Sequence, residues 1–441
     1  MRSYPTSDGE YFDEAEVAPA EQLERRRWYR ISHVLRYAVR HLPFYTERLL
    51  AGGYRPGRIS GAEEFAALVP SFHKSDLIDA IVQGGRAEAG IEALAGRRVT
   101  NIVMTSGTLG FNTFAFLTAS DLRGGNLRNA LRELWLVKVR PDMRVLTLSP
   151  AWHILALLDS LALSRIGAVP VAPWGTFVPR FTANFLDAVQ RLRPEHMLVT
   201  APILRAMLAE CQRTGRSPRD VFAAVRYVAC AGEALSPAFR QEIIDAMDLE
   251  DLFERGGSSD GMFGGGECFA HRGHHIFADL HYVEIVDPRT GQTLPPGRRG
   301  SAVVTNLTLG RSVYIRFDTE DLAEIREGDC PCGRTHPVVE MYGRLADCAL
   351  LDDRIIAPYD VRCVMDSLPQ LRGEPFTLEG LQDRKGVRVT LARSAPVDQA
   401  VLTQLRDRLQ GQVQVPVVMA EGQTQLTGWK GQVMRREASQ R

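Results

Sequence analysis

The segment VTNIVMTSGTLGFNTFAFLT, residues 99–118, predicts two strands joined by a turn that is rich in glycine and hydroxyl side chains. Glycines let the backbone approach a ligand closely, and hydroxyl and bare N–H groups bind phosphate oxygens, so we interpret the turn as a phosphate-binding loop. It lacks the Gly-Lys-Ser/Thr ending of a Walker loop. An ordinary hairpin turn is the alternative. The candidate phosphate ligands are Thr105, Ser106, Gly107, Thr108 and Gly110.

Composition favours several domains and argues against two kinds of partner. The chain has 441 residues, 45% of them apolar, which is enough for two or more buried cores. Lys plus Arg and Asp plus Glu both number 53, so bulk charge favours neither nucleic acid nor an anionic membrane. There is no apolar leader and no uninterrupted run of about 18 apolar residues. We therefore expect a soluble cytoplasmic protein.

The pattern of apolar residues divides the chain into three parts. Residues 1–20 predict a flexible N-terminal arm, and residues 21–344 predict a large domain. Between 143 and 233, strands alternate with helices, which is typical of a parallel α/β sheet. From 279 to 344, apolar and polar residues alternate and predict an antiparallel, β-rich subdomain. Residues 345–441 predict a small α+β domain.

A second glycine-rich stretch, FERGGSSDGMFGGGEC, spans residues 253–268 and contains six glycines. So many glycines are tolerated mainly where backbone lies against a ligand. Asp260 within it is a natural Mg²⁺ partner, because Mg²⁺ takes one or two carboxylates together with phosphate oxygens. A flexible surface loop is the alternative. Farther along, Asp321 in DTEDL could accept hydrogen bonds from a ribose, although this signal is weak alone.

The cysteines suggest a metal site. Seven cysteines in a chain without a secretion signal favour free or metal-bound thiols over a disulfide framework. Cys330 and Cys332, with Cys268 and His275 about sixty residues upstream, could close a tetrahedral and structural Cys3His zinc site. Buried free cysteines are the alternative. Three other histidines are rivals for the fourth position: His274, His271 and His336.

Five motifs follow one another along the chain: TSGTLGFNT, CAGEALS, GGSSDG, YIRFDTEDL and CPCGRTHPVVEMYGRLAD. In this order they resemble the motifs of the phenylacetate–coenzyme A ligase family, a branch of the adenylate-forming enzymes. The loop is similar to the family's SSGTTGKPT, and the last motif is the closest match. The resemblance begins at LPFYTERL and covers nearly all of the remaining chain.

The resemblance implies an adenylate-forming fold with a mobile C-terminal domain, a homodimer, and two half-reactions. A carboxylate attacks the α-phosphorus of ATP, and a thiol, normally coenzyme A, then displaces AMP from the acyl-adenylate. Some relatives carry zinc at the cysteine cluster. The positions that the resemblance assigns are Gly232 and Glu233 at adenine, Ser259 at a hydroxyl position, Asp260 at Mg²⁺, Asp321 at the ribose, Arg344 at the nucleotide and Asp347 at the hinge.

The chain also departs from the family pattern. The loop lacks the usual Lys-Pro, and Gln432 stands where the adenylation lysine is expected, with Lys430 two residues away. A neutral amide cannot replace a cation between carboxylate and phosphate, so a neighbouring cation must substitute or the step is slow. Asp353 replaces a glycine of the pantetheine channel. These departures allow an amine or a carrier protein as the acceptor, or a nucleotide-binding relative that has lost turnover.

The expected substrate is a small, aromatic or otherwise hydrophobic carboxylic acid. In parallel sheets, ligands bind beyond the carboxyl ends of strands, and glycine backbone there leaves room for a flat ring. For His153, the alternative to substrate contact is the role of an ordinary polar residue at a strand end. The predicted substrate residues are Trp152, His153, Ala231, Gly256 and Gly257.

Overall fold

The computed structural model describes residues 10–84, 99–104, 114–119, 121–122, 125–148, 153–171, 182–259, 263–309, 313–392 and 397–422. The helices in these ranges are η1 (Glu14–Val17), α1 (Ala20–His41), α2 (Pro43–Ala51), α3 (Ala62–Leu68), α4 (Lys74–Gly84), α5 (Gly125–Leu136), α6 (Ile154–Ile166), α7 (Thr182–Leu192), α8 (Ala201–Arg213), α9 (Pro218–Val221), α10 (Pro237–Met247), η3 (Leu345–Asp347), α11 (Pro358–Asp366) and α12 (Gln399–Val413).

The strands are β1 (Val99–Met104), β2 (Phe114–Thr118), β3 (Arg144–Thr147), β4 (Val169–Val171), β5 (His196–Thr200), β6 (Tyr227–Ala231), β7 (Asp251–Ser258), β8 (Phe263–Glu267), β9 (His274–Ile276), β10 (His281–Val286), β11 (Gly300–Asn306), β12 (Phe317–Ile325), β13 (Val338–Arg344), β14 (Ala349–Leu350), β15 (Ile355–Ile356), β16 (Phe376–Gly380), β17 (Val387–Ala392) and β18 (Val417–Gly422).

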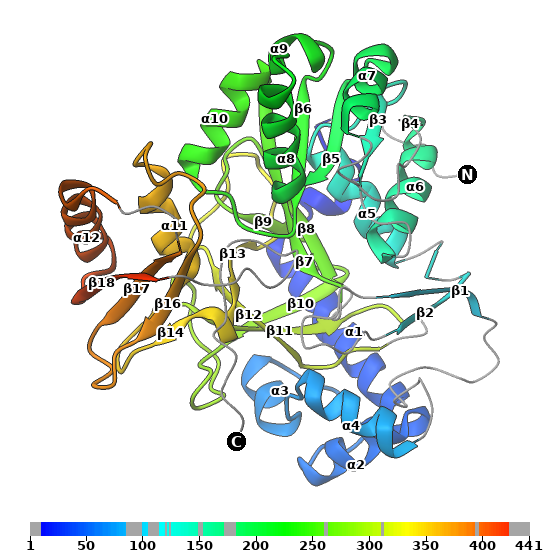
Figure 1. Ribbon diagram of the computed structural model, residues 1–441. Coiled ribbons are helices and arrows are strands. Elements are labelled where there is room, and N and C mark those ends of the chain that lie inside the picture. The colour runs from blue at the N-terminus through cyan, green and yellow to red at the C-terminus, as the bar shows by residue number, and fades with distance from the viewer. Residues whose placement is uncertain are drawn as a thin grey trace.

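One mixed sheet of eleven strands runs through the molecule in the order β10-β11-β12-β13-β9-β8-β7-β6-β5-β3-β4 (Figure 1). Strands β3 to β7 pair in parallel, as the alternation of strands and helices predicts. Strand direction reverses at the β7–β8 pair, and the remaining strands are antiparallel. The predicted mixture of α/β and antiparallel structure is confirmed. The two kinds of strand share one sheet, so a subdomain boundary at 279 stays a prediction.

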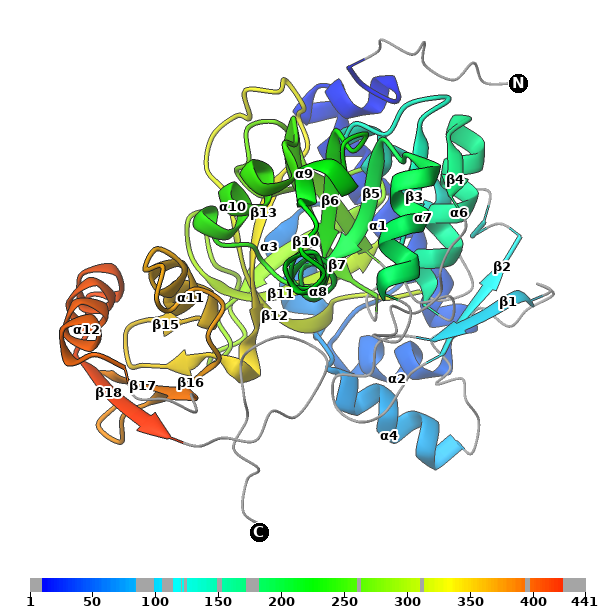
Figure 2. The same cartoon turned by 45° about the horizontal axis from the view of Figure 1, so that its top comes forward.

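Helices cover both faces of the parallel strands. Because successive strand residues point to opposite faces, Val145 and Ala229 pack with α5 and α6, whereas their neighbours Leu146 and Val228 pack with α7, α8 and α10. Figure 2 shows α8 and α10 beside β6. The carboxyl ends of the parallel strands are therefore left as an edge between two helical layers, where ligands bind in such sheets.

The hairpin predicted from the opening segment is present. Strands β1 and β2 pair in antiparallel fashion, with Met104 opposite Phe114. The candidate phosphate loop between them lies outside the described residues. Leu117 of β2 is buried and packs with α5, so the hairpin is anchored to the same apolar cluster as the main sheet.

Residues 10–20, which the sequence predicts to be part of a flexible arm, are packed against the body of the molecule. The Glu16 carboxylate is fully buried and accepts a hydrogen bond from Arg334 at 2.6 Å. Asp13 accepts hydrogen bonds from Arg128 and Arg132 of α5. Paired charges of this kind hold the segment together with apolar contacts of Phe12 and Ala18, and the arm expected from the sequence is docked in this range.

The C-terminal part carries a separate three-stranded sheet, β16-β17-β18, with its own apolar core. Figure 1 shows this sheet and α12 at one side of the large sheet. Two polar contacts join α11 to the body that carries the large sheet. Ser236 at the N-cap of α10 donates to Asp366 at 2.6 Å, and Arg299, just before β11, pairs with Asp360 at 2.8 Å. We therefore propose, as the sequence predicts, that a separate C-terminal domain begins at residue 345.

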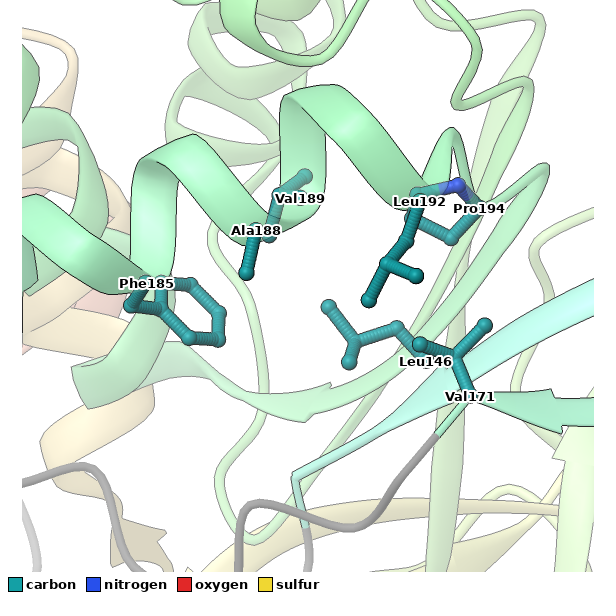
Figure 3. A pocket seen from close by; sticks show the side chains of 7 residues that line it. All are labelled: Leu146, Val171, Phe185, Ala188, Val189, Leu192 and Pro194. Atoms are coloured by element: carbon teal, nitrogen blue, oxygen red, sulfur yellow. The ribbon is translucent and has the colours of Figure 1, made fainter.

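A small apolar cavity lies between α7 and strands β3 and β4 (Figure 3). Its walls carry no charged side chain, so the space suits no carboxylate or nucleotide. It belongs to the helix–sheet core. The lining residues are Leu146, Val171, Phe185, Ala188, Val189, Leu192 and Pro194. In the described part of the chain, every helix is too short or too polar to cross a membrane.

Candidate active site

The carboxyl ends of β6 and β7 bring several predicted site residues together. These strands are neighbours, with Ala231 opposite Arg255, so Ala231, Gly232 and Gly256 lie close to one another. Gly232 has a φ of 99°, a left-handed conformation that a side chain would strain. At Gly257, an added Cβ would lie 2.4 Å from the carbonyl oxygen of Phe263, so only glycine fits.

The segment predicted to contact adenine leads from β6 into α10. Ser236 caps this helix by accepting the N–H of Phe239 at 3.1 Å. Burial raises the pKa of Glu233, while the guanidinium groups of Arg205 and Arg362 act to lower it. Glu233 therefore sits at a partly closed position beside α11, where cations are close enough to stabilise its charge.

The predicted ribose and nucleotide residues face each other across two paired strands. Asp321 on β12 is opposite Arg344 on β13, and the Arg344 Nε lies 3.2 Å from the Asp321 carboxylate. Arg344 also donates to the carbonyl oxygen of Thr319 at 2.8 Å. The Asp321 side chain is mostly buried, so this ion pair fixes the orientation of both groups. Asp347 lies just beyond, in η3.

His153 has a structural role at the start of α6. Its Nδ1 accepts the N–H of Leu155 at 3.2 Å, so the ring is the N-cap of the helix. This contact agrees with the ordinary polar role that was the alternative for this histidine. The neutral ring then carries its proton on Nε2, which leaves that atom as a hydrogen-bond donor.

Several predicted residues lie outside the described ranges. Ser259 lies in the turn that directly follows β7 and is the last described residue before one of them. The residues concerned are Thr105, Ser106, Gly107, Thr108, Gly110, Trp152, Asp260, Lys430 and Gln432.

Of the three glycines of the second glycine-rich stretch that lie in β8, two allow close packing. An added Cβ at Gly266 would lie 3.2 Å from Val137 beside α5, and one at Gly265 would lie 2.2 Å from the carbonyl oxygen of His275. At Gly264 the nearest atom would be Glu133 Oε2 at 3.5 Å. The sequence suggested that these glycines mark mainly contact with a ligand, but Gly265 and Gly266 allow a strand and a helix to approach β8 closely.

A buried polar cluster beside β8 was missed in the sequence. Arg255 of β7 contacts Glu133 of α5 at 2.6 Å and Asp159 of α6 at 2.7 Å, and Asn129 donates to Glu133 at 3.4 Å. We call these four residues the Arg255 cluster. The signal that could have found it is the charge pattern of the helices, since a carboxylate interrupts the apolar run HILALLDSLALSRIG.

The four predicted zinc ligands converge. Cys268, His275, Cys330 and Cys332 are buried, and their ligand atoms all lie within 4.8 Å of one another. We call these residues the Cys3His cluster. The Cys268 and Cys330 sulfurs are 3.5 Å apart, and the Cys332 sulfur is 3.2 Å from His275 Nε2. Tetrahedral coordination with Zn–S bonds of about 2.3 Å gives S···S edges of roughly 3.7 Å, so the donor set fits zinc.

The rival histidines have other partners. His274 Nδ1 lies 3.2 Å from the carbonyl oxygen of Val339. His271 contacts Asp251 and Glu267, and these hydrogen bonds raise its pKa to about 9. His336 Nδ1 accepts the N–H of Ala278 at 3.2 Å. Each of the three is committed elsewhere in the described structure, which leaves His275 as the histidine of the cluster.

Comparison with known proteins identifies the family of the chain. The family model described as AMP-binding enzyme matches residues 72–313. A phenylacetate-coenzyme A ligase of Thermus thermophilus is 28% identical over 369 residues, covering 82% of this chain and 79% of that protein. A phenylacetate-coenzyme A ligase of Aromatoleum evansii is 26% identical, covering 86% and 82%.

Solved structures show the same fold. A 2-hydroxyisobutyryl-CoA ligase in the postadenylation state, in complex with 2-HIB-AMP, gives a TM-score of 0.83 at 20% identity and covers 99% of this chain and 94% of its own. MatB from Rhodopseudomonas palustris with bound ATP gives 0.55 at 18% identity, covering 77% and 67%. The adenylate-forming fold expected from the sequence is confirmed. The chain therefore belongs to the AMP-binding enzyme family, as an adenylate-forming ligase.

Proposed function

We propose that this enzyme activates a carboxylic acid with ATP and transfers the acyl group to coenzyme A. The observation that carries the proposal is the match of the family model to residues 72–313, which include the ends of β6 and β7 and their glycines. In the first step, a carboxylate oxygen forms a bond to the α-phosphorus and pyrophosphate leaves. In the second, the thiol sulfur bonds to the acyl carbon and AMP leaves.

The nucleotide would be held by groups from distant parts of the chain. We assign the phosphates to the loop at Ser106, the adenine to Gly232 and Glu233, and the ribose diol to Asp321. Charge neutralisation and positioning are the main needs of phosphoryl chemistry, since the step requires little covalent help from the protein. Asp260 would hold Mg²⁺, which supplies positive charge at the phosphate oxygens when it is bound. Lys430 would supply the cation that Gln432 cannot.

The Asp321–Arg344 pair supports the ribose assignment. A carboxylate that is fixed by an arginine on the neighbouring strand keeps its charge and its orientation, and both are needed to accept two hydrogen bonds from a diol. Arg344 lies next to the predicted hinge at Asp347, so a nucleotide contact and the C-terminal part would be adjacent.

Coenzyme A is the acceptor that we favour, because the matched relatives are named coenzyme A ligases. Asp353 gave the sequence argument for an amine or a carrier protein instead. Its carboxylate is exposed and pairs with Arg354 at 2.8 Å, which partly neutralises the charge that would face an incoming pantetheine chain. An aromatic acid remains our proposal for the substrate.

We also propose a structural zinc ion at the Cys3His cluster. Cysteine and histidine donors at four buried positions fit Zn²⁺ and leave no ligand position for a reacting water. A bound ion would tie β8 and β9 to the loop before β13, and this loop contacts the docked N-terminal segment: Tyr11 donates to the carbonyl oxygen of Cys332 at 2.9 Å.

Two assays on the purified protein test the function. ATP–pyrophosphate exchange with a panel of carboxylic acids measures adenylation, and mass spectrometry of the products after adding coenzyme A or amines identifies the acceptor. We expect acid-dependent exchange and an acyl-CoA product. Amide products without thioester would show that an amine, and not coenzyme A, is the acceptor. Nucleotide binding without any exchange would favour a relative that has lost turnover.

A further inference from the structure

The Arg255 cluster holds more negative than positive charge. The Arg255 guanidinium makes a two-point contact with Asp159, at 3.0 and 2.7 Å, and places its Nε 2.6 Å from Glu133 Oε1. All three side chains are at least 94% buried. One guanidinium thus serves two carboxylates, and no other described residue forms an ion pair with either of them.

The second oxygen of Glu133 is poorly matched. Its Oε2 accepts only a long hydrogen bond, 3.4 Å, from Asn129 Nδ2. The Asn129 side-chain oxygen is buried and has no hydrogen-bond partner in the part of the chain that the structure describes. Buried polar groups are nearly always hydrogen-bonded, so an acceptor without a partner beside one that has only a long hydrogen bond points to a missing donor.

Glu133 Oε2 and the side-chain amide of Asn129 lie beside the paired ends of β7 and β8, where the substrate is expected. The point at which a Cβ of Gly264 would stand is 3.5 Å from Glu133 Oε2, 3.6 Å from Asn129 Nδ2 and 3.5 Å from the carbonyl oxygen of Gly256. Gly256 is one of the predicted substrate residues, and Gly264 pairs opposite Gly257. The absence of a side chain at Gly264 leaves this polar corner uncovered on the strand.

We propose that the carboxylic acid activated by this enzyme carries an amino group, which donates hydrogen bonds to Glu133 Oε2 and Asn129 Oδ1. This inference rests on the proposed function and specifies the substrate class of the same site. An amino group has at least two N–H donors for the two acceptors, whereas a hydroxyl group has one and a hydrocarbon has none. An ammonium group would also balance the negative charge of the Glu133 carboxylate.

The physical basis is the cost of leaving buried acceptors unmatched. A site built to hydrogen-bond a substrate group rejects an analogue that lacks it, because the buried polar atoms then lose their water without gaining a donor. The pKa of Glu133 is raised by burial to about 7, with Arg255 opposing the rise, which fits a carboxylate that lacks a full partner in the free enzyme.

Pyrophosphate exchange with matched acids tests the proposal. The panel contains benzoate, the three aminobenzoates and the three hydroxybenzoates, together with aliphatic amino acids and their unsubstituted counterparts. We expect kcat/KM for the best amino acid substrate to exceed that of its unsubstituted counterpart by about 100-fold or more. Preference for an aminobenzoate indicates an arylamine, and preference for an aliphatic amino acid indicates an ammonium group.

Two variants locate the effect. Glu133→Gln keeps the side-chain shape and an acceptor toward Arg255 but removes the charge, and it should lower kcat/KM for the amino substrate at least tenfold with little change for an unsubstituted acid. Gly264→Ala adds one methyl group at ordinary contact distance, without strain at a positive φ, and should cause the same selective loss. Glu284→Gln is the matched control, since Glu284 is a buried carboxylate on the edge strand β10 that pairs with Arg316.

The outcomes separate this inference from the proposed function. Equal exchange with amino and unsubstituted acids would overturn the inference and leave the ligase function standing. Exchange with none of a broad panel of acids, by a protein that binds ATP, would overturn the function itself. A loss in Glu133→Gln that is the same for every acid would show a structural role and would also contradict the inference.

Discussion

Two polar clusters are buried against the same strand, β8, and they differ in how completely their atoms are matched. In the Cys3His cluster, four ligand atoms converge on one point within 4.8 Å, so a single ion would satisfy all of them. In the Arg255 cluster, one cation serves two carboxylates, and the Asn129 oxygen lacks a partner among the described residues. In the first cluster a single ion would satisfy every ligand atom, which suits a structural role. The second cluster has hydrogen-bond acceptors that are not fully satisfied, which suits recognition of a ligand.

The largest effect is expected at the Cys3His cluster. Cys332→Ser should abolish metal binding and cooperative unfolding, because structural zinc sites contribute on the order of 10 kcal/mol to folding. Metal content by mass spectrometry and thermal unfolding with and without a chelator measure this effect. Cys211→Ser, a buried cysteine of α8 outside the cluster, is the control. A metal-free protein that unfolds at the same temperature would contradict the zinc proposal.

Arg255→Met should cost about 3–5 kcal/mol of unfolding free energy, since it leaves two buried carboxylates without their cation. Urea denaturation measures the loss. The matched control is Arg226→Met, because Arg226 forms an exposed pair with Glu250 and its removal should cost less than about 1 kcal/mol. Equal losses of unfolding free energy in the two variants would show that the buried Arg255 cluster contributes no more to stability than an exposed ion pair.

Asp321→Asn should reduce kcat/KM for ATP by about 100-fold, roughly 2.7 kcal/mol, because a neutral amide is a weaker acceptor for the ribose diol and no longer pairs with Arg344. Pyrophosphate exchange at varied ATP concentrations measures this. Asp318→Asn on the same strand serves as the control, with its carboxylate hydrogen-bonded to Ser301. If Asp321→Asn exchanged at the wild-type rate, the ribose assignment would fail.

The pH dependence of stability should reveal the unmatched carboxylate. The folded pKa of Glu133, about 7, lies above its ordinary value of 4.5, so between these values the folded protein binds more protons than the unfolded chain. Wild-type stability relative to Glu133→Gln should therefore fall as the pH rises from 4.5 to 7, by about 1–3 kcal/mol. Urea titrations of both proteins at several pH values measure this difference, and a constant difference would show that Glu133 titrates normally.

The sequence predicted individual helices and strands better than the contacts between residues that are far apart in the chain. The opening segment predicts a hairpin, and β1 and β2 form it, because alternation and turn residues are local properties. Residues 10–20 looked like an arm because the residue that neutralises Glu16 is Arg334, more than 300 positions away. Composition alone cannot show such a pairing.

The candidate site shows the same division. Spacing left His274 and His275 as equal rivals, and only the register of β9 against β13 turns one ring toward Cys332. Glycines at 264–266 suggested ligand contact, yet two of them make room for α5 and β9. The Arg255 cluster was missed because its charges lie on a strand and two helices that are far apart in sequence.

Carboxylate-dependent ATP–pyrophosphate exchange is the most direct test of the account as a whole. The account predicts that the purified protein with Mg²⁺ exchanges labelled pyrophosphate into ATP only when an acid is present, and fastest with an acid that bears an amino group. Exchange that is independent of any added acid, or its absence with every acid in a protein shown to bind ATP, would contradict it.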